Sequence, residues 1–147
     1  MRSVFVDTSA FVALRNESEA EHERARAALA SLIEAGATLF TSNYVFAETY
    51  TALLVRVGRE EAIEWGRRFR AGEAIELVRL EPDVEDEAWQ ILERHRDKQW
   101  SYVDATSFAL IERDGGDEAF ALDAHFSQRG LRVWPEAGAS GPRPARS

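Results

Sequence analysis

Four acidic residues are the candidates for chemistry in this sequence: Asp7, Glu48, Asp104 and Asp123. A charged group at a strand end or on an otherwise apolar helix face needs hydrogen bonds, a counter-ion or a metal if it is even partly buried. Hard divalent cations such as Mg²⁺ and Mn²⁺ take oxygen ligands, and bound ions can position water and neutralise charge at a phosphate. We therefore expect all four carboxylates to be metal ligands and catalytic residues.

Each acid also has a simpler structural interpretation. Asp7 follows the apolar run 3–6, where Asp is a preferred N-cap for the next helix. Residues 101–104, Ser-Tyr-Val-Asp, match a capping box, and Asp123 can cap a short helix that follows it. Glu48 has mainly apolar neighbours one helical turn away, which favours a partly buried position. The set of four, rather than any one member, indicates a metal site.

The histidines and clustered arginines are weaker candidates. His22 and His95 fall in charged helices and are expected to be exposed, whereas His125 is close to Asp123 and therefore to the predicted site. We expect none of the three to be catalytic. An arginine cluster is expected to form a solvated helix face rather than an RNA contact: Arg67, Arg68 and Arg70.

Composition restricts the class of protein. With 147 residues and 45% hydrophobic residues, the chain has the size of one domain with one core. It has no cysteine, which excludes disulfides and thiolate metal sites. No apolar run is long enough to span a membrane, so we expect a cytoplasmic protein. The net charge of -8 argues mildly against a nucleic-acid enzyme, although cations at the site would offset part of it.

Apolar runs and helical periodicities alternate along the chain. Strands are predicted at residues 3–6, 38–41, 75–80, 119–122 and 131–134. Helices are predicted at about 10–15, 19–35, 44–57, 59–71, 82–92 and 101–113, with a short one around residue 126. This alternation predicts an α/β fold with a mainly parallel sheet covered on both faces, whose ligands bind beyond the carboxyl ends of the strands. Residues 1–134 are expected to form one domain, and residues 135–147 a disordered tail.

The four acids and their surroundings resemble PIN-domain ribonucleases, especially the VapC-like toxins of toxin–antitoxin pairs. The resemblance rests on four segments in order: Val4-Phe5-Val6-Asp7-Thr8-Ser9-Ala10-Phe11, Asn43-Tyr44-Val45-Phe46-Ala47-Glu48-Thr49, Ser101-Tyr102-Val103-Asp104-Ala105 and Ala121-Leu122-Asp123-Ala124-His125-Phe126. It implies a three-layer α/β/α sandwich and Mg²⁺- or Mn²⁺-dependent endonucleolytic cleavage of RNA that leaves a 5′-phosphate. It also implies that Ser9 supports the first aspartate, that the protein is a homodimer, and that a cognate antitoxin blocks the site.

Particular residues distinguish this function from three others. A phosphatase with an aspartyl nucleophile needs a second acid two residues after Asp7, where this chain has Ser9. A receiver-like phosphoacceptor domain needs a lysine after a late strand, but the only lysine, Lys98, lies between two predicted helices. A non-catalytic PIN-fold module that binds protein or RNA remains the alternative, and the presence of all four acids argues against it.

Overall fold

The computed structural model describes residues 2–136, in which five strands alternate with seven helices. The strands are β1 (Ser3–Val6), β2 (Thr38–Ser42), β3 (Ile75–Val78), β4 (Glu118–Phe120) and β5 (Arg132–Trp134). The helices are α1 (Thr8–Arg15), α2 (His22–Glu34), α3 (Asn43–Arg56), α4 (Arg59–Ala71), α5 (Pro82–Arg94), α6 (Tyr102–Arg113) and α7 (His125–Gln128).

The five strands form one parallel sheet in the order β3-β2-β1-β4-β5. The chain adds strands on one side of β1 and then returns to add β4 and β5 on the other side. The strand order therefore reverses between β1 and β4, and such a switch point opens a crevice at the carboxyl ends of the strands. Val6 of β1 is paired with Phe120 of β4 at this end of the sheet.

The middle strand β1 is apolar because both faces of a covered parallel sheet are buried. Val4, Phe5 and Val6 are each at most 1% exposed. On this core, Phe5 contacts Phe40 edge-on with ring centroids 5.4 Å apart and stacks on Phe126 at 6.2 Å. The buried aromatic packing fixes β1, and therefore the residue that follows it, relative to β2 and α7.

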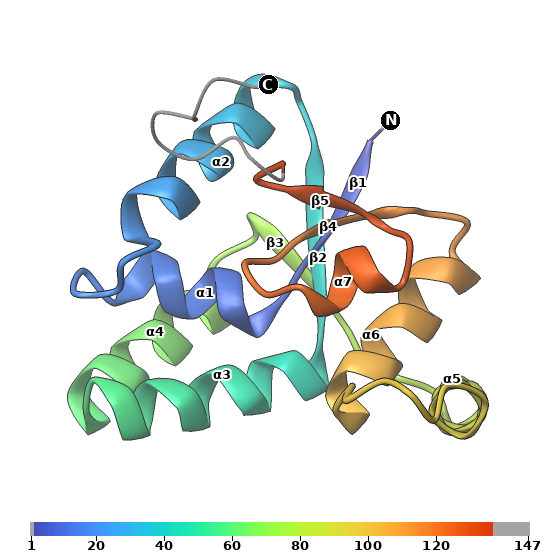
Figure 1. The fold of residues 1–147 in the computed structure, drawn as a ribbon. Coiled ribbons are helices and arrows are strands. Elements are labelled where there is room, and N and C mark those ends of the chain that lie inside the picture. The colour runs from blue at the N-terminus through green and yellow to red at the C-terminus, as the bar shows by residue number, and fades with distance from the viewer. Residues whose placement is uncertain (1, 137–147) are drawn as a thin grey trace.

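Helices cover both sides of the sheet, as the predicted α/β sandwich requires. In Figure 1, α1 and α2 lie on the left of the central strands and α5 and α6 on the right, while α3 crosses beneath their carboxyl ends. α3 packs against both α1 and α6. The helix therefore faces the end of the sheet where the switch point lies.

Several element boundaries differ from the predicted ones. β4 ends at Phe120 rather than at residue 122, because the amide of Leu122 donates to the Ser9 hydroxyl instead of to a strand. α1 begins at Thr8, two residues earlier than predicted, and its N-cap is Asp7, which confirms the capping interpretation of this residue. α2 begins three residues later than predicted. Of the expected tail, residues 137–147 lie outside the described part, so the predicted disorder and the domain boundary at 134 remain predictions.

Candidate active site

Asp7 stands directly after β1 and is 3% exposed. Its backbone amide donates to the carbonyl oxygen of Phe120, which ties it to the end of β4. Its Oδ2 accepts hydrogen bonds from the backbone amide of Ser9 at 3.0 Å and from the Ser9 hydroxyl at 2.7 Å. Among residues 2–136, its Oδ1 has no hydrogen-bond partner, so one carboxylate oxygen is fixed and the other remains available.

Ser9 connects the two sides of the switch point. Its hydroxyl donates to Asp7 and accepts the backbone amide of Leu122 at 2.9 Å. The hydroxyl therefore uses its single proton on the carboxylate and a lone pair on the segment after β4. These two hydrogen bonds hold the Asp7 carboxylate and the segment that leads to Asp123, and the supporting role of Ser9 at a metal site stays a prediction.

Asp104 lies in the first turn of α6 and is 7% exposed. The predicted capping box is confirmed: the amide of Asp104 donates to the Ser101 hydroxyl at 2.9 Å, and the amide of Ser101 donates to Asp104 Oδ2 at 3.0 Å. The same Oδ2 lies 2.7 Å from Nδ1 of His125. Within the described chain, Oδ1 of Asp104 has no hydrogen-bond partner, so the capping role leaves one oxygen for a ligand.

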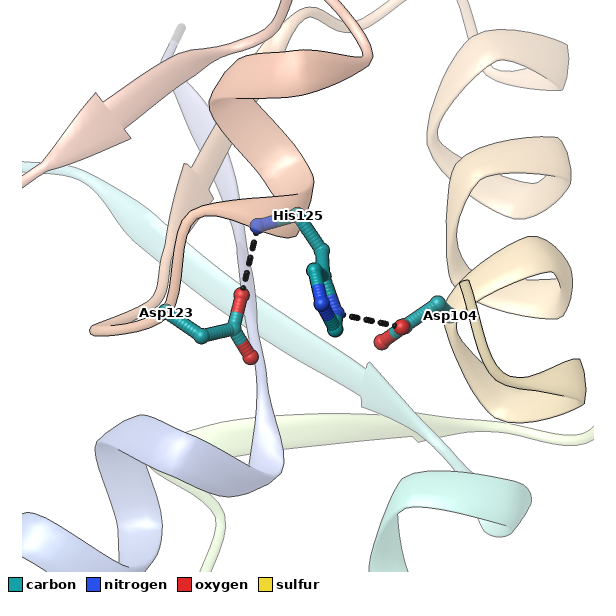
Figure 2. A group of neighbouring side chains, drawn as sticks. All are labelled: Asp104, Asp123 and His125. Atoms are coloured by element: carbon teal, nitrogen blue, oxygen red, sulfur yellow. Dashed lines mark hydrogen bonds and ion pairs between the residues drawn. The ribbon is translucent and has the colours of Figure 1, made fainter. Parts of the chain in front are cut away.

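Asp123 lies three residues beyond β4, in the turn before α7, and its residue surface is exposed. Its Oδ1 accepts the backbone amide of His125 at 3.0 Å. Figure 2 shows the imidazole of His125 between the carboxylates of Asp123 and Asp104. Because an ionised carboxylate only accepts hydrogen bonds, the contact with Asp104 makes Nδ1 the protonated nitrogen of His125.

Glu48 comes from the second turn of α3 and is half-buried. The side chain of Ser42 caps α3 by accepting the amide of Val45 at 3.0 Å. One residue after Glu48, the hydroxyl of Thr49 contacts that of Thr8 at 3.2 Å, which holds this part of α3 against the start of α1. Capping and this contact therefore present Glu48 to the same region as Asp7.

The four predicted acids line one cavity of about 520 Å³, together with Ser9, Ser101 and His125. No lysine or arginine within residues 2–136 forms an ion pair with any of them; His125 is their only basic partner there. Within the cavity, one ligand atom each from Asp104, Asp123 and His125 lie within 4.8 Å of one another. Asp7 and Glu48 line the same cavity outside this closest group. His125 lies near Asp123, as the sequence predicts, and it also contacts Asp104.

The electrostatics reflect this crowding of acids. Burial, followed by the negative charge of Asp123, raises the pKa of Asp7 from 3.8 to about 7, although the hydrogen bonds from Ser9 oppose the shift. Burial also raises the pKa of Glu48, with smaller contributions from the charges of Asp104 and Asp123. Partial burial also raises the pKa of Asp123, with a smaller contribution from the charge of Asp104. A cation bound among these carboxylates would favour their ionised forms and would therefore oppose all three increases in pKa.

The residues present fit a divalent metal. Oxygen donors dominate the cavity, and each of the three aspartates has one oxygen held by protein hydrogen bonds and one without a partner among the described residues. This pattern orients the ligands in advance, as outer hydrogen bonds do in metal sites. Asp7, Glu48, Asp104 and Asp123 are therefore suited to hold Mg²⁺ or Mn²⁺, and His125 offers a nitrogen beside them.

The other candidates lie elsewhere. Against expectation, His22 and His95 are half-buried, because the Nδ1 of each bonds a backbone carbonyl, of Ala13 and Ile91 respectively. The predicted arginine cluster lies on α4, outside the cavity, where Arg67 and Arg68 pair with glutamate. Two further residues line the cavity without having been predicted from the sequence: Arg56 and Glu19. No helix among residues 2–136 has the length and hydropathy of a membrane span.

This chain is similar to known proteins over most of its length. The family model described as PIN domain matches residues 4–130. The 23S rRNA-specific endonuclease VapC20 of two Mycobacterium tuberculosis strains is 37% identical over 134 residues, which cover 90% of this chain and 99% of that protein.

Solved structures extend the comparison. The crystal structure of Mycobacterium tuberculosis VapC20, described as a sarcin-ricin loop cleaving toxin, has a TM-score of 0.81 and 34% identity, and the match covers 96% of this chain and 99% of that one. The crystal structure of FitAcB from Neisseria gonorrhoeae has 18% identity and a TM-score of 0.61, and the match covers 88% of this chain and 95% of that one. The two proteins share the fold. This chain therefore belongs to the PIN-domain family, among its VapC-like members.

Proposed function

We propose that this protein is a metal-dependent endoribonuclease and the toxin of a toxin–antitoxin pair. The observation that carries the proposal is the convergence of four carboxylates from four separate segments on one cavity, without a lysine or arginine partner among residues 2–136. A structural cluster of acids would be expected to contain balancing cations, because unpaired buried charge is costly. The proposed cofactor, Mg²⁺ or Mn²⁺, supplies that balance.

Asp7, Glu48, Asp104 and Asp123 are proposed to hold the cation through their oxygens. When bound, such an ion lowers the pKa of water and neutralises charge at a phosphodiester. Ser9 acts as a positioning residue, because its hydroxyl orients Asp7 and ties it to the segment after β4. The capping box holds Asp104 at the start of α6, so stability and ligand geometry depend on the same two hydrogen bonds.

The proposed substrate is RNA, and 23S ribosomal RNA is the first substrate to test. The support is the 37% identity to a protein named as a 23S rRNA-specific endonuclease over nearly the whole length of both chains. Action on this RNA would take place in the cytoplasm. Asp123, which lines the cavity, is exposed, so a substrate in solution can reach this carboxylate.

Two protein partners are also proposed. VapC-like membership supports a cognate antitoxin, which would be encoded beside this gene and would cover the acidic cavity. A homodimer is supported by the exposed apolar residues at the end of α3: Leu54 is 40% exposed, Val55 78% and Val57 39%. Sedimentation of the wild type and of Val55→Asp tests this assembly; a monomeric wild type would contradict it.

The nuclease proposal is tested by incubating purified protein with isolated ribosomes and with protein-free RNA, in Mn²⁺, in Mg²⁺ and in excess EDTA. Asp104→Asn is the inactive variant, and Asp86→Asn is the matched control, since Asp86 is exposed on α5 and does not line the cavity. We expect cleavage by the wild type and the control only when metal is present. A wild type that binds but never cuts RNA would favour the non-catalytic PIN-fold module.

A further inference from the structure

The cavity extends along α3 beyond the acidic cluster. Glu48, Ala52 and Arg56 all line it, and their four-residue spacing keeps them on one broad face of the helix. Arg56 lies two turns beyond Glu48, a rise of roughly 12 Å along the helix axis. Across the cavity from this end of α3 lies Glu19, from the connection between α1 and α2.

Arg56 is the only lysine or arginine among the described residues that line this cavity. Its side chain is 57% exposed. Its Nη1 lies 3.6 Å from Oε2 of Glu19, an ion pair longer than a hydrogen bond. The neighbouring acid, Glu21, is already paired with Arg24, whose Nη1 donates to it at 3.1 Å. The guanidinium of Arg56 is therefore accessible and only loosely held.

An RNA strand that enters this cavity brings several negative charges to a protein whose net charge is -8. A cation at the carboxylates would neutralise the reacting phosphate, but its effect would not replace a contact two helical turns away. A guanidinium presents a planar fork that matches phosphate. The pair with Glu19 is long and partly exposed, and such ion pairs are weak. Exchange of the carboxylate for a phosphate therefore breaks only a weak contact at this position.

We propose that Arg56 binds a backbone phosphate outside the reacting position and releases Glu19 when RNA enters the cavity, an inference that rests on the proposed ribonuclease function. Arg56 is then a positioning residue that sets where the strand lies relative to the carboxylates. Glu19 competes with the RNA for the same guanidinium. The two members of one ion pair therefore have opposite effects on RNA binding.

The experiment measures binding of a fluorescently labelled single-stranded RNA by anisotropy, in Mg²⁺, with every substitution made in the non-cleaving Asp104→Asn protein. Arg56→Gln should raise the Kd about tenfold, as expected for loss of a charge-assisted hydrogen bond. It should also reduce the slope of log K against log salt by about 0.7, the value for one phosphate of a single strand. Glu19→Gln should lower the Kd about two- to fivefold, because the competing pair is removed.

The control is a second arginine–glutamate pair, which lies within one helix and is more exposed. Arg26 and Glu23 are exposed on α2, their charged atoms are 3.9 Å apart, and neither lines the cavity. Arg26→Gln and Glu23→Gln reproduce the two charge changes and should each alter the Kd less than about twofold, since exposed pairs contribute little. Circular dichroism and melting temperature establish that all variants fold.

Two results would overturn the inference. In the first, Arg56→Gln and Glu19→Gln weaken RNA binding equally, which is expected if the ion pair is purely structural. In the second, Arg56→Gln changes the Kd no more than Arg26→Gln does. Failure of the proposed function gives a different result. In that case the protein with Asp104 intact does not cut RNA in Mg²⁺ or Mn²⁺, while the opposite effects of Arg56→Gln and Glu19→Gln on binding persist and support the phosphate contact.

Discussion

Replacement of Asp7 by asparagine is expected to stabilise the metal-free protein at alkaline pH. The carboxyl is 3% exposed, and burial together with the charge of Asp123 raises its pKa from 3.8 to about 7. Keeping it ionised above pH 7 therefore costs the folded state about 4 kcal/mol. Asparagine carries no charge, and its carbonyl oxygen can accept the two hydrogen bonds from Ser9. We expect a gain of about 2–4 kcal/mol in the free energy of unfolding at pH 8.

The gain should depend on pH in a defined direction. Between about pH 4 and pH 7 the folded protein keeps a proton on Asp7 that the unfolded chain has released, so wild-type stability falls as pH rises through this window. Below pH 4 both states are protonated, and the advantage of Asp7→Asn should disappear. Urea denaturation in EDTA at pH 4 and pH 8 measures both values. For a chain of this length, each kcal/mol corresponds to about 3 °C in Tm.

Asp86→Asn is the control, because Asp86 is exposed on α5 and lies outside the cavity. It should show no pH-dependent gain. The reasoning would be refuted by Asp7→Asn being less stable than the wild type at pH 8, or by an equal gain at both pH values, since neither result follows from an ionised buried carboxylate.

Asp104→Asn should change the free energy of unfolding by less than about 1 kcal/mol, because asparagine can still accept a hydrogen bond from the amide of Ser101. RNA cleavage by this variant should fall more than a hundredfold. If the variant unfolds but keeps full activity per folded molecule, Asp104 has only the capping role. Ser9→Ala should cost about 1–3 kcal/mol in urea denaturation, because the partly buried amide of Leu122 loses its acceptor. An unchanged stability would contradict that hydrogen bond. Phe126→Ala should cost about 3–5 kcal/mol by the same assay, since the ring fills the core between α7 and β1, and a cost below 1 kcal/mol would mean that the packing is looser than described.

Much of the fold follows from local patterns that the sequence shows directly. The apolar run before Asp7 predicts a buried strand, and β1 is the fully buried middle strand of the sheet. Alternation with helices predicts a parallel sheet, which is what the strands form. The end of β4 was predicted wrongly because Ala121 and Leu122 are apolar like the strand, while the amide of Leu122 bonds to a serine more than a hundred residues away. A contact of that range has no signature in a local pattern.

In the candidate site, too, local features could be predicted from the sequence, whereas contacts between distant segments could not. The capping box of Asp104 is visible in four consecutive residues, and its second use as a site residue is compatible because the box occupies only one carboxylate oxygen. The position of His125 between two aspartates depends on how α7 packs on α6, and the approach of Glu19 to Arg56 depends on the path between α1 and α2. These contacts join distant segments, so residue spacing could not predict them.

The central claim is that the carboxylate cluster binds a divalent cation that RNA cleavage requires. The most direct measurement is a Mn²⁺ titration of metal-stripped protein, in which bound Mn²⁺ is followed by electron paramagnetic resonance and RNA cleavage is followed in the same samples. We predict that cleavage is absent in EDTA and rises in proportion to bound Mn²⁺, and that Asp104→Asn weakens both while Asp86→Asn affects neither. Equal cleavage with and without chelator, in protein free of contaminating nuclease, would contradict the account.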